Sequence, residues 1–144
     1  MKITICGSSS FRRQMVEFRD RLNSMGHEAL IHPDYEKWAN GEEPEWLKRV
    51  ENEHHLVKKE YGFIKWYYNS IVGSDAIIVL NFDKNGIRNY VGGNTLMEMG
   101  FAHVHGKKVF LLNDAPEMNY SDEILATTTK VLNGDLTKIP MKPE

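Results

Sequence analysis

Short apolar runs alternate along this chain with longer segments in which apolar residues recur every three or four positions. Consecutive apolar side chains dominate residues 76–80 and 108–112, and a β-rich run occupies residues 2–6. Because strands that are buried on both faces lose the apolar–polar alternation, these runs are typical of a parallel sheet covered by helices. Weaker strand patterns at residues 28–31 and 130–132 bring the expected sheet to about five strands.

Helical periodicity fills the intervals between these runs. Apolar residues recur at helical spacing over residues 11–25, from Pro44 to residue 71, and over residues 95–105. Residues 32–34 predict a turn, whereas residues 35–43 are polar and irregular. The alternation of strands and helices predicts an α/β domain of Rossmann-like or flavodoxin-like type, with three layers, a mostly parallel sheet and right-handed crossovers.

Length and composition indicate a single domain over residues 1–144. Hydrophobic residues make up 41% of the chain and charged residues 26%, the mixture of a folded protein. The formal net charge of -2 argues against a nucleic-acid polymer as partner. The single cysteine, Cys6, excludes an internal disulfide and a multi-cysteine metal site. No apolar run approaches the ~20 residues of a membrane helix, and no signal-peptide pattern opens the sequence, so we expect a cytoplasmic protein without a membrane partner.

Open α/β sheets bind ligands at the carboxyl ends of their strands, which directs attention to the loops that follow each apolar run. After the first run the chain reads Gly7, Ser8, Ser9, Ser10, with Arg12 close behind. Backbone N–H groups, serine hydroxyls and the guanidinium could together hold a phosphate at this turn. The turn lacks the spacing of a P-loop or a dinucleotide fingerprint, and a serine that simply caps the next helix remains an equal alternative.

The second loop leads into a segment whose one carboxylate lies among apolar residues. Glu98 is the only acidic or basic side chain between Asn89 and His103. Partial desolvation should raise its pKa and suit it to act as a nucleophile or an acid–base group. The adjacent Gly92 and Gly93 would let the loop approach a ligand closely.

A structural role for Glu98 stays open beside the functional one. Thr95 and Glu98 match a capping box, in which threonine caps a helix and glutamate bonds back to it. The spacing favours the box, whereas the apolar setting favours a functional carboxylate. We also count Asp83 and Asn94 in the second loop, and Asn113 in the loop after residue 112, as candidate ligand-binding residues.

Three motifs resemble one enzyme family. Residues 5–8 resemble the first turn of the 2'-deoxynucleoside 5'-phosphate N-hydrolases. Residues 74–79, followed by residues 93–102, resemble the wider nucleoside 2-deoxyribosyltransferase family. In that family a glutamate in a Glu-hydrophobic-Gly-hydrophobic-Ala pattern is the nucleophile, and here the pattern begins at Glu98.

The resemblance implies a reaction and a set of partners. Glu98 would attack the anomeric carbon of a nucleoside or nucleoside 5'-monophosphate and expel the base. Water or another base would then accept the sugar from Glu98. This chemistry needs no metal and no organic cofactor. The family commonly forms homodimers or higher homo-oligomers, for which an aromatic stripe could supply a contact, although an ordinary core is an equal alternative. The stripe comprises Trp46, Tyr61, Trp66, Tyr67 and Tyr68.

The chain departs from the family on the helix before the central strand. The family carries there an aspartate that binds the sugar and assists base release, whereas residues 63–69 contain no acid. Tyr67 or Tyr68 could substitute as a hydrogen-bond donor. Three functions therefore stay in view: cleavage or exchange of an N-glycosidic bond, a non-catalytic nucleotide-binding or sensing module, and an interaction domain.

Overall fold

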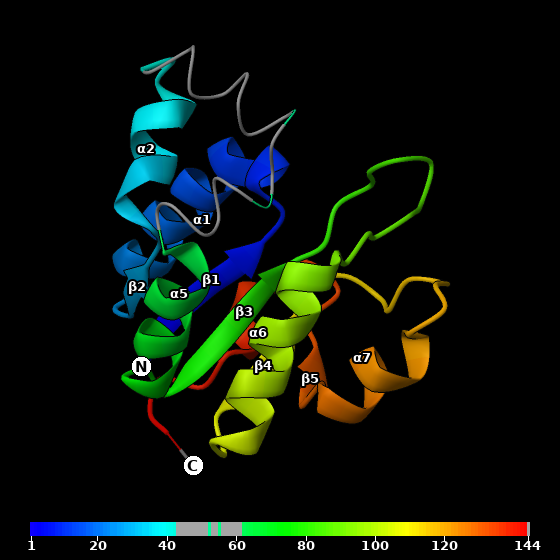
Figure 1. Ribbon diagram of the computed structural model, residues 1–144. Coiled ribbons are helices and arrows are strands. Elements are labelled where there is room, and N and C mark those ends of the chain that lie inside the picture. Colours follow the sequence, from blue (N-terminus) through cyan, green and yellow to red (C-terminus); the bar gives the residue numbers. More distant parts are fainter. Residues whose placement is uncertain (43–51, 53–54, 56–61, 144) are drawn as a thin grey trace.

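The computed structural model describes residues 1–42, 52, 55 and 62–143 (Figure 1). The helix expected from Pro44 lies largely outside these residues, and so do Trp46 and Tyr61 of the aromatic stripe. Residues 52 and 55 and the part from residue 63 fall in the described chain, where they are helical.

In the described part of the chain, five parallel strands form one sheet in the order β2-β1-β3-β4-β5. The α/β class, the parallel sheet and its five strands confirm the prediction, and the strand order is that of the flavodoxin-like fold. The direction in which consecutive strands are added to the sheet reverses at β1. Strand β2 lies on one side of β1, whereas β3 lies on the other and β4 and β5 follow it. The strands are β1 (Lys2–Gly7), β2 (Glu28–Leu30), β3 (Ala76–Leu80), β4 (Lys108–Leu111) and β5 (Lys130–Val131).

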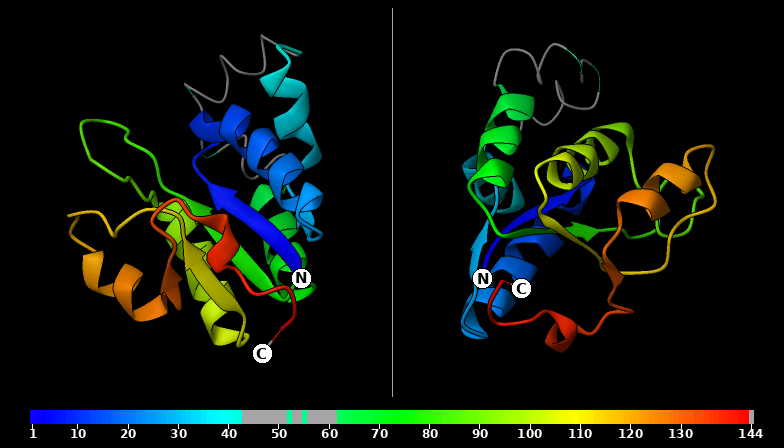
Figure 2. Two further views of the ribbon diagram at one scale, coloured as in Figure 1. Left: turned by 180° about the vertical axis from the view of Figure 1, so that it is seen from behind. Right: turned by 90° about the horizontal axis from the view of Figure 1, so that it is seen from below.

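Helices cover both faces of the sheet (Figures 1 and 2). Right-handed crossovers that run in opposite directions along a sheet place their helices on opposite faces. Accordingly, α5 and α6 lie on one face, while α1 and the C-terminal segment lie on the other, as the right view of Figure 2 shows. The helices are η1 (Ser9–Phe11), α1 (Arg12–Ser24), α2 (Pro33–Ala39), α5 (Phe63–Val72), α6 (Gly93–Val104), α7 (Ser121–Thr127) and η2 (Leu136–Lys138).

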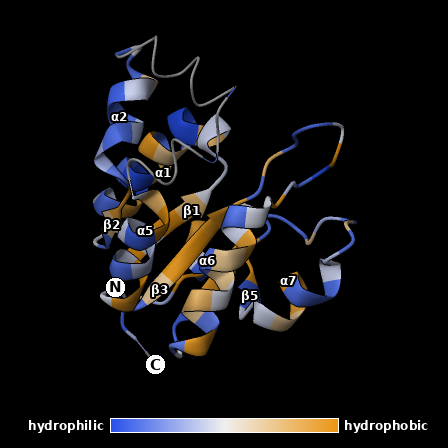
Figure 3. Ribbon diagram, in the orientation of Figure 1, coloured by the Kyte–Doolittle hydropathy of each residue, from blue (hydrophilic) through white to orange (hydrophobic). Residues whose placement is uncertain are grey.

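The sheet is the apolar centre of the molecule (Figure 3). Every residue of β3 is buried, as expected for a central strand between two helical layers. One polar link crosses from this centre to α5, because the buried Thr4 hydroxyl hydrogen-bonds the hydroxyls of Ser70 at 2.8 Å and Ser74 at 2.7 Å. This link fixes the C-terminal end of α5 against the middle of β1.

The prediction of a turn at residues 32–34 and an irregular segment after it is wrong for residues 33–39, which are helical. Pro33 opens helix α2, where its fixed φ angle suits the first helical position and its missing N–H costs nothing. His32 caps the helix by accepting a 3.1 Å hydrogen bond at Nδ1 from the N–H of Asp34. The helix packs on α1 and buries Tyr35 and Trp38, so tertiary packing stabilises a segment that looked polar along the sequence.

Among the described residues, no helix combines the length and the apolar character that crossing a membrane requires.

Candidate active site

A cavity of about 230 Å³ opens at the carboxyl ends of β1 and β3, where chain order reverses. This is the position at which open α/β sheets bind ligands. Its walls come from the β1 turn, helices α2, α5 and α6, and the loop between β3 and α6. The lining residues are Gly7, Ser8, Ser9, Tyr35, Trp38, Phe63, Ile64, Tyr67, Lys84, Asn85, Tyr90, Gly92, Gly93, Asn94, Thr95, Met97, Glu98 and Phe101.

The turn after β1 forms the floor at one end. Gly7 ends β1 opposite Leu80 of β3, and a Cβ atom at Gly7 would lie 3.0 Å from the Leu80 carbonyl oxygen and 3.1 Å from Met15 Cε. Glycine is therefore required for the two strands to approach here. Ser8 caps η1 by accepting a 3.3 Å hydrogen bond from the N–H of Ser10, so the capping role expected of one serine is confirmed.

The capping-box interpretation of Glu98 is wrong. Helix α6 begins two residues earlier than the sequence pattern suggested, with Gly92 as its N-cap and no side-chain cap. Thr95 lies inside the helix, and Glu98 sits in its second turn, too far along to bond back to the helix start. The Glu98 side chain instead faces the cavity and is only 8% exposed.

Three ionisable side chains lie near Glu98, and its negative charge contributes to raising the pKa of each. Burial raises the pKa of Cys6 well above its usual value, and the nearby Glu98 carboxylate, to which the thiol hydrogen-bonds, raises it further. Burial also raises the pKa values of Tyr35 and Tyr67, and the charge of Glu98 adds to both. All three groups are therefore protonated and neutral at neutral pH, and the Cys6 thiol donates a hydrogen bond to the carboxyl group.

Aromatic rings form the wall opposite α6. Tyr35 and Phe63 stack with ring centroids 5.8 Å apart and an interplanar angle of 18°, and Trp38 packs against Phe63 at 5.6 Å. Tyr67, 3% exposed, continues this wall from α5. Of these aromatic residues only Tyr67 was predicted to belong to the site, because Tyr35 and Trp38 lie on the helix that the sequence pattern did not predict.

The loop between β3 and α6 brings the one cation of the described lining residues into the cavity. Lys84 donates a 2.7 Å hydrogen bond from Nζ to Ser8 Oγ, and Nζ also lies 5.5 Å from the ring centroid of Tyr90. A tight turn at Asn85 and Gly86, both with positive φ, lets Lys84 pair with Ile87 across the loop. The sequence pattern did not predict Lys84 or Tyr90 as site residues, because they lie in a loop of mostly polar residues.

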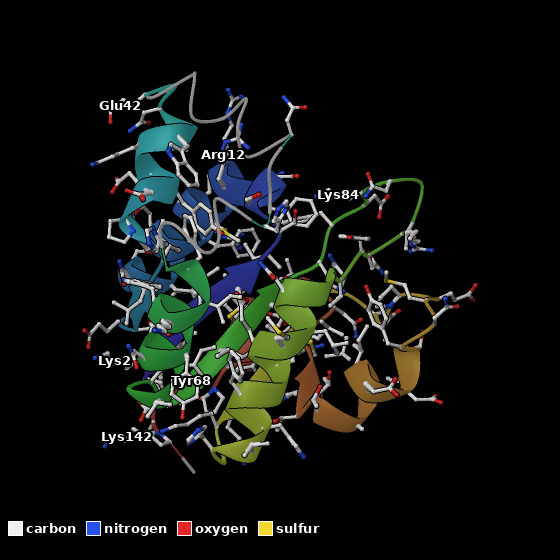
Figure 4. All side chains as sticks on the ribbon, in the orientation of Figure 1. Lys2, Arg12, Glu42, Tyr68, Lys84 and Lys142 are labelled. Atoms are coloured by element: carbon white, nitrogen blue, oxygen red, sulfur yellow. The ribbon has the colours of Figure 1, made fainter. Side chains whose placement is uncertain are left out.

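Of the predicted phosphate-binding residues, Gly7, Ser8 and Ser9 line the cavity, whereas Ser10 and Arg12 do not. Ser10 is exposed. Arg12, labelled with Lys84 in Figure 4, donates from Nη1 to the carbonyl oxygen of Ser9 at 3.2 Å and so braces the turn.

Two other predicted residues lie outside the lining and hold loops together. Asp83 Oδ1 accepts a 2.9 Å hydrogen bond from the N–H of Asn89 within the loop after β3. Asn113 donates two hydrogen bonds to Asn81, from its N–H to Oδ1 at 2.9 Å and from Nδ2 to the carbonyl oxygen at 3.0 Å, which ties the end of β4 to the end of β3. In contrast, the predicted residues Gly92, Gly93 and Asn94 all line the cavity.

Asp75 and Cys6 hold structural positions in the sheet. Asp75 accepts a 2.8 Å hydrogen bond from the N–H of Lys2 and so pins the start of β3 to β1. Cys6 is fully buried within β1, although its contact with Glu98 was not foreseen. Within the described chain, no group of three or more histidine, cysteine or acidic residues is placed to hold a metal ion.

No protein-family model matches the sequence, and no curated protein matches it. Among solved structures, the chain is similar to the CMP N-glycosidase of Clostridium botulinum, BcmB, with a TM-score of 0.50 and 15% sequence identity. The similarity covers 90% of this chain and 84% of the other. At this level of identity the two proteins share a fold, and the chain therefore has the α/β architecture that a CMP N-glycosidase also uses.

Proposed function

We propose that this protein belongs to the nucleoside 2-deoxyribosyltransferase-like enzymes and cleaves the N-glycosidic bond of a nucleoside or nucleoside 5'-monophosphate, with Glu98 as nucleophile. The observation that carries the proposal is the placement of Glu98, a buried carboxyl group on α6 that faces a cavity at the topological switch point. The fold shared with a CMP N-glycosidase supports the same class of reaction.

The chemistry follows from a carboxylate in a shielded cavity. A Glu98 oxygen forms a bond to the anomeric carbon while the bond to the base nitrogen breaks, and the base leaves with the electron pair. Water then attacks the anomeric carbon of the glycosyl ester, which frees the sugar and regenerates the carboxylate. The buried Cys6 thiol hydrogen-bonds the carboxyl group and restricts its rotation, which keeps Glu98 aimed into the cavity.

The aromatic wall gives the base a place to bind. A purine or pyrimidine ring stacks on aromatic side chains, and Tyr35, Trp38 and Phe63 offer such a surface across the cavity from α6. Tyr67 lines the same cavity, and its phenol, kept protonated by burial, is the donor we assign to the departing base or the sugar. It takes the place of the aspartate that the resemblance leads us to expect on this helix.

Release of free base tests the proposal. The wild-type protein is incubated with ribo- and 2'-deoxyribonucleosides and their 5'-monophosphates, and free base is measured by chromatography. We expect release from at least one substrate, reduced at least about 10³-fold in Glu98→Gln because the neutral amide cannot act as nucleophile. Release that Glu98→Gln leaves unchanged would overturn the proposed role of Glu98.

A non-catalytic nucleotide-binding module is the second candidate, and one observation favours it. Glu98 is the sole acidic side chain among the described residues that line the cavity, so no second carboxylate is at hand for proton transfer. Tight nucleotide binding without turnover, equal in wild type and Glu98→Gln, would favour this candidate over the enzyme.

A further inference from the structure

Lys84 is a cation without a carboxylate partner in the described chain. The ion pairs among the described residues involve Arg19 with Asp20 and Glu36, and His32 with Asp34, but not Lys84. Its Nζ instead donates to the Ser8 hydroxyl at 2.7 Å, across the mouth formed by two separate loops. Partial burial lowers the pKa of Lys84, so the ammonium group has given up hydration that no anion within the described chain replaces.

The Ser8 hydroxyl is set up to donate to an anion beside Lys84. Ser8 Oγ accepts from Lys84 Nζ and from the N–H of Ser10, and these contacts occupy its lone pairs. Its own O–H proton has no acceptor in the described part of the chain. A lysine ammonium and a serine hydroxyl that converge at the end of a strand are the donor set that a phosphate group requires.

The side of the cavity away from Ser8 and Lys84 is lined by a carboxyl group and aromatic rings. There Glu98 faces the aromatic residues of α2 and α5, which suit a sugar and a base rather than a dianion. A nucleotide therefore fits in one direction, with the phosphate towards Ser8 and Lys84 and the anomeric carbon towards Glu98. The opposite direction would place a phosphate beside the carboxylate.

We propose that Lys84, carried on the loop between β3 and α6, binds the 5'-phosphate together with Ser8 and makes the protein specific for nucleoside 5'-monophosphates over nucleosides. This inference rests on the proposed function for its substrate class. It assigns the charge to the second loop, because Arg12, the cation that the sequence suggested, braces Ser9 and does not line the cavity.

Kinetics on matched substrate pairs test the assignment. Base release is measured for cytidine and CMP, adenosine and AMP, and their 2'-deoxy counterparts, with wild type, Lys84→Met, Lys84→Arg and Arg88→Gln. We expect wild type to prefer the monophosphate of a pair, and Lys84→Met to lower kcat/KM for that monophosphate about 10- to 100-fold, mainly through KM. The nucleoside of the same pair should change by less than about twofold, and Lys84→Arg should restore part of the loss.

Arg88→Gln is the matched control, because it removes a positive charge from the same loop at an exposed position outside the cavity lining. It should leave the preference for the monophosphate intact. An equal loss for nucleoside and nucleotide in Lys84→Met would show that Lys84 only shapes the loop and would overturn the inference. A wild-type enzyme that cleaves nucleosides as well as nucleotides would overturn it too.

Binding measured without turnover separates this inference from the proposed function. Calorimetric titration of Glu98→Gln with CMP and AMP, with and without Lys84→Met, reports phosphate recognition alone. Binding of CMP or AMP that weakens at least tenfold in the double variant supports the role of Lys84 even if no base is ever released. Base release from nucleosides with no effect of Lys84→Met would leave the proposed function standing and reject the inference.

Discussion

Cys6, Tyr35 and Tyr67 lie near Glu98 as neutral, protonated groups, since burial raises the pKa of each and the charge of Glu98 raises it further. A carboxylate among neutral groups keeps its negative charge available to an approaching anomeric carbon. The Cys6 thiol, which hydrogen-bonds the carboxyl group, stabilises it when it leaves the sugar in the second step. A neighbouring lysine or arginine would instead pair with the carboxylate and compete with the substrate.

Replacing one phenol tests this arrangement. Tyr67→Phe removes a buried hydroxyl from a residue that lines the cavity, while it keeps the ring that packs against Trp66 at 4.9 Å. We expect kcat to fall about 10- to 100-fold through loss of a donor to the reacting groups, and the free energy of unfolding to change by less than about 1 kcal/mol. Steady-state kinetics and urea denaturation provide the two readouts.

Tyr68→Phe serves as the control on the next position of α5. Its hydroxyl contacts His105 Nε2 at 3.0 Å on the exposed side of the helix, away from the cavity lining. We expect kcat to stay within twofold of wild type. Equal kcat values for both variants would exclude a catalytic contribution of the Tyr67 hydroxyl.

At residue level, the sequence could identify Glu98 but not its whole environment. A lone carboxylate in an apolar helix is visible in the pattern, and Gly92 and Gly93 mark the close loop beside it. Lys84 could not be found in this way, because a lysine in a polar loop is ordinary until the fold brings it to Ser8. Arg12 was a candidate by proximity along the chain, but its guanidinium contacts the backbone of Ser9.

At the scale of elements, the start of α6 decides the role of Glu98. The sequence offered Thr95 as N-cap, but Gly92 and Gly93 begin the helix, which carries Glu98 into the second turn and onto the cavity face. Sequence patterns locate helix ends poorly when glycines precede a conventional cap, since glycine tolerates the cap position as well. The two interpretations of Glu98 differ by this shift of the N-cap by three positions.

Gly93 offers a test at this scale. A Cβ atom there would meet no protein atom within 4 Å, and Gly93 lines the cavity. We expect Gly93→Ala to fold with unchanged or slightly higher stability, by up to about 1 kcal/mol, and to lower kcat/KM at least tenfold because the methyl group occupies space that the substrate needs. Thermal unfolding and base release measure the two effects.

Gly100→Ala is the matched control on the same helix, since a Cβ atom there also meets nothing within 4 Å but lies outside the cavity lining. Alanine inside a helix should raise stability by about 1 kcal/mol without affecting kcat/KM. Unimpaired turnover in Gly93→Ala would mean that the substrate does not approach the start of α6.

At the scale of the whole molecule, the fold class followed from the sequence because each central strand is an uninterrupted apolar run between helical segments. Ala76–Leu80 and Lys108–Leu111 were located to within a residue. Helix α2 was missed because its seven residues are stabilised by packing on α1 rather than by an obvious apolar stripe. That one omission hid the aromatic wall, so the sequence predicted the position of the site better than its shape.

Trapping of the covalent intermediate tests the central claim, that Glu98 attacks the sugar, most directly. The protein is mixed with a 2'-deoxy-2'-fluoro analogue of its preferred substrate, whose electron-withdrawing fluorine slows both steps at an oxocarbenium-like centre. Intact-protein mass spectrometry and peptide mapping then locate any adduct. We predict one added sugar or sugar phosphate, attached to the peptide that contains Glu98 and absent from Glu98→Gln. An adduct on any other residue, or on Glu98→Gln to the same extent, would contradict the account.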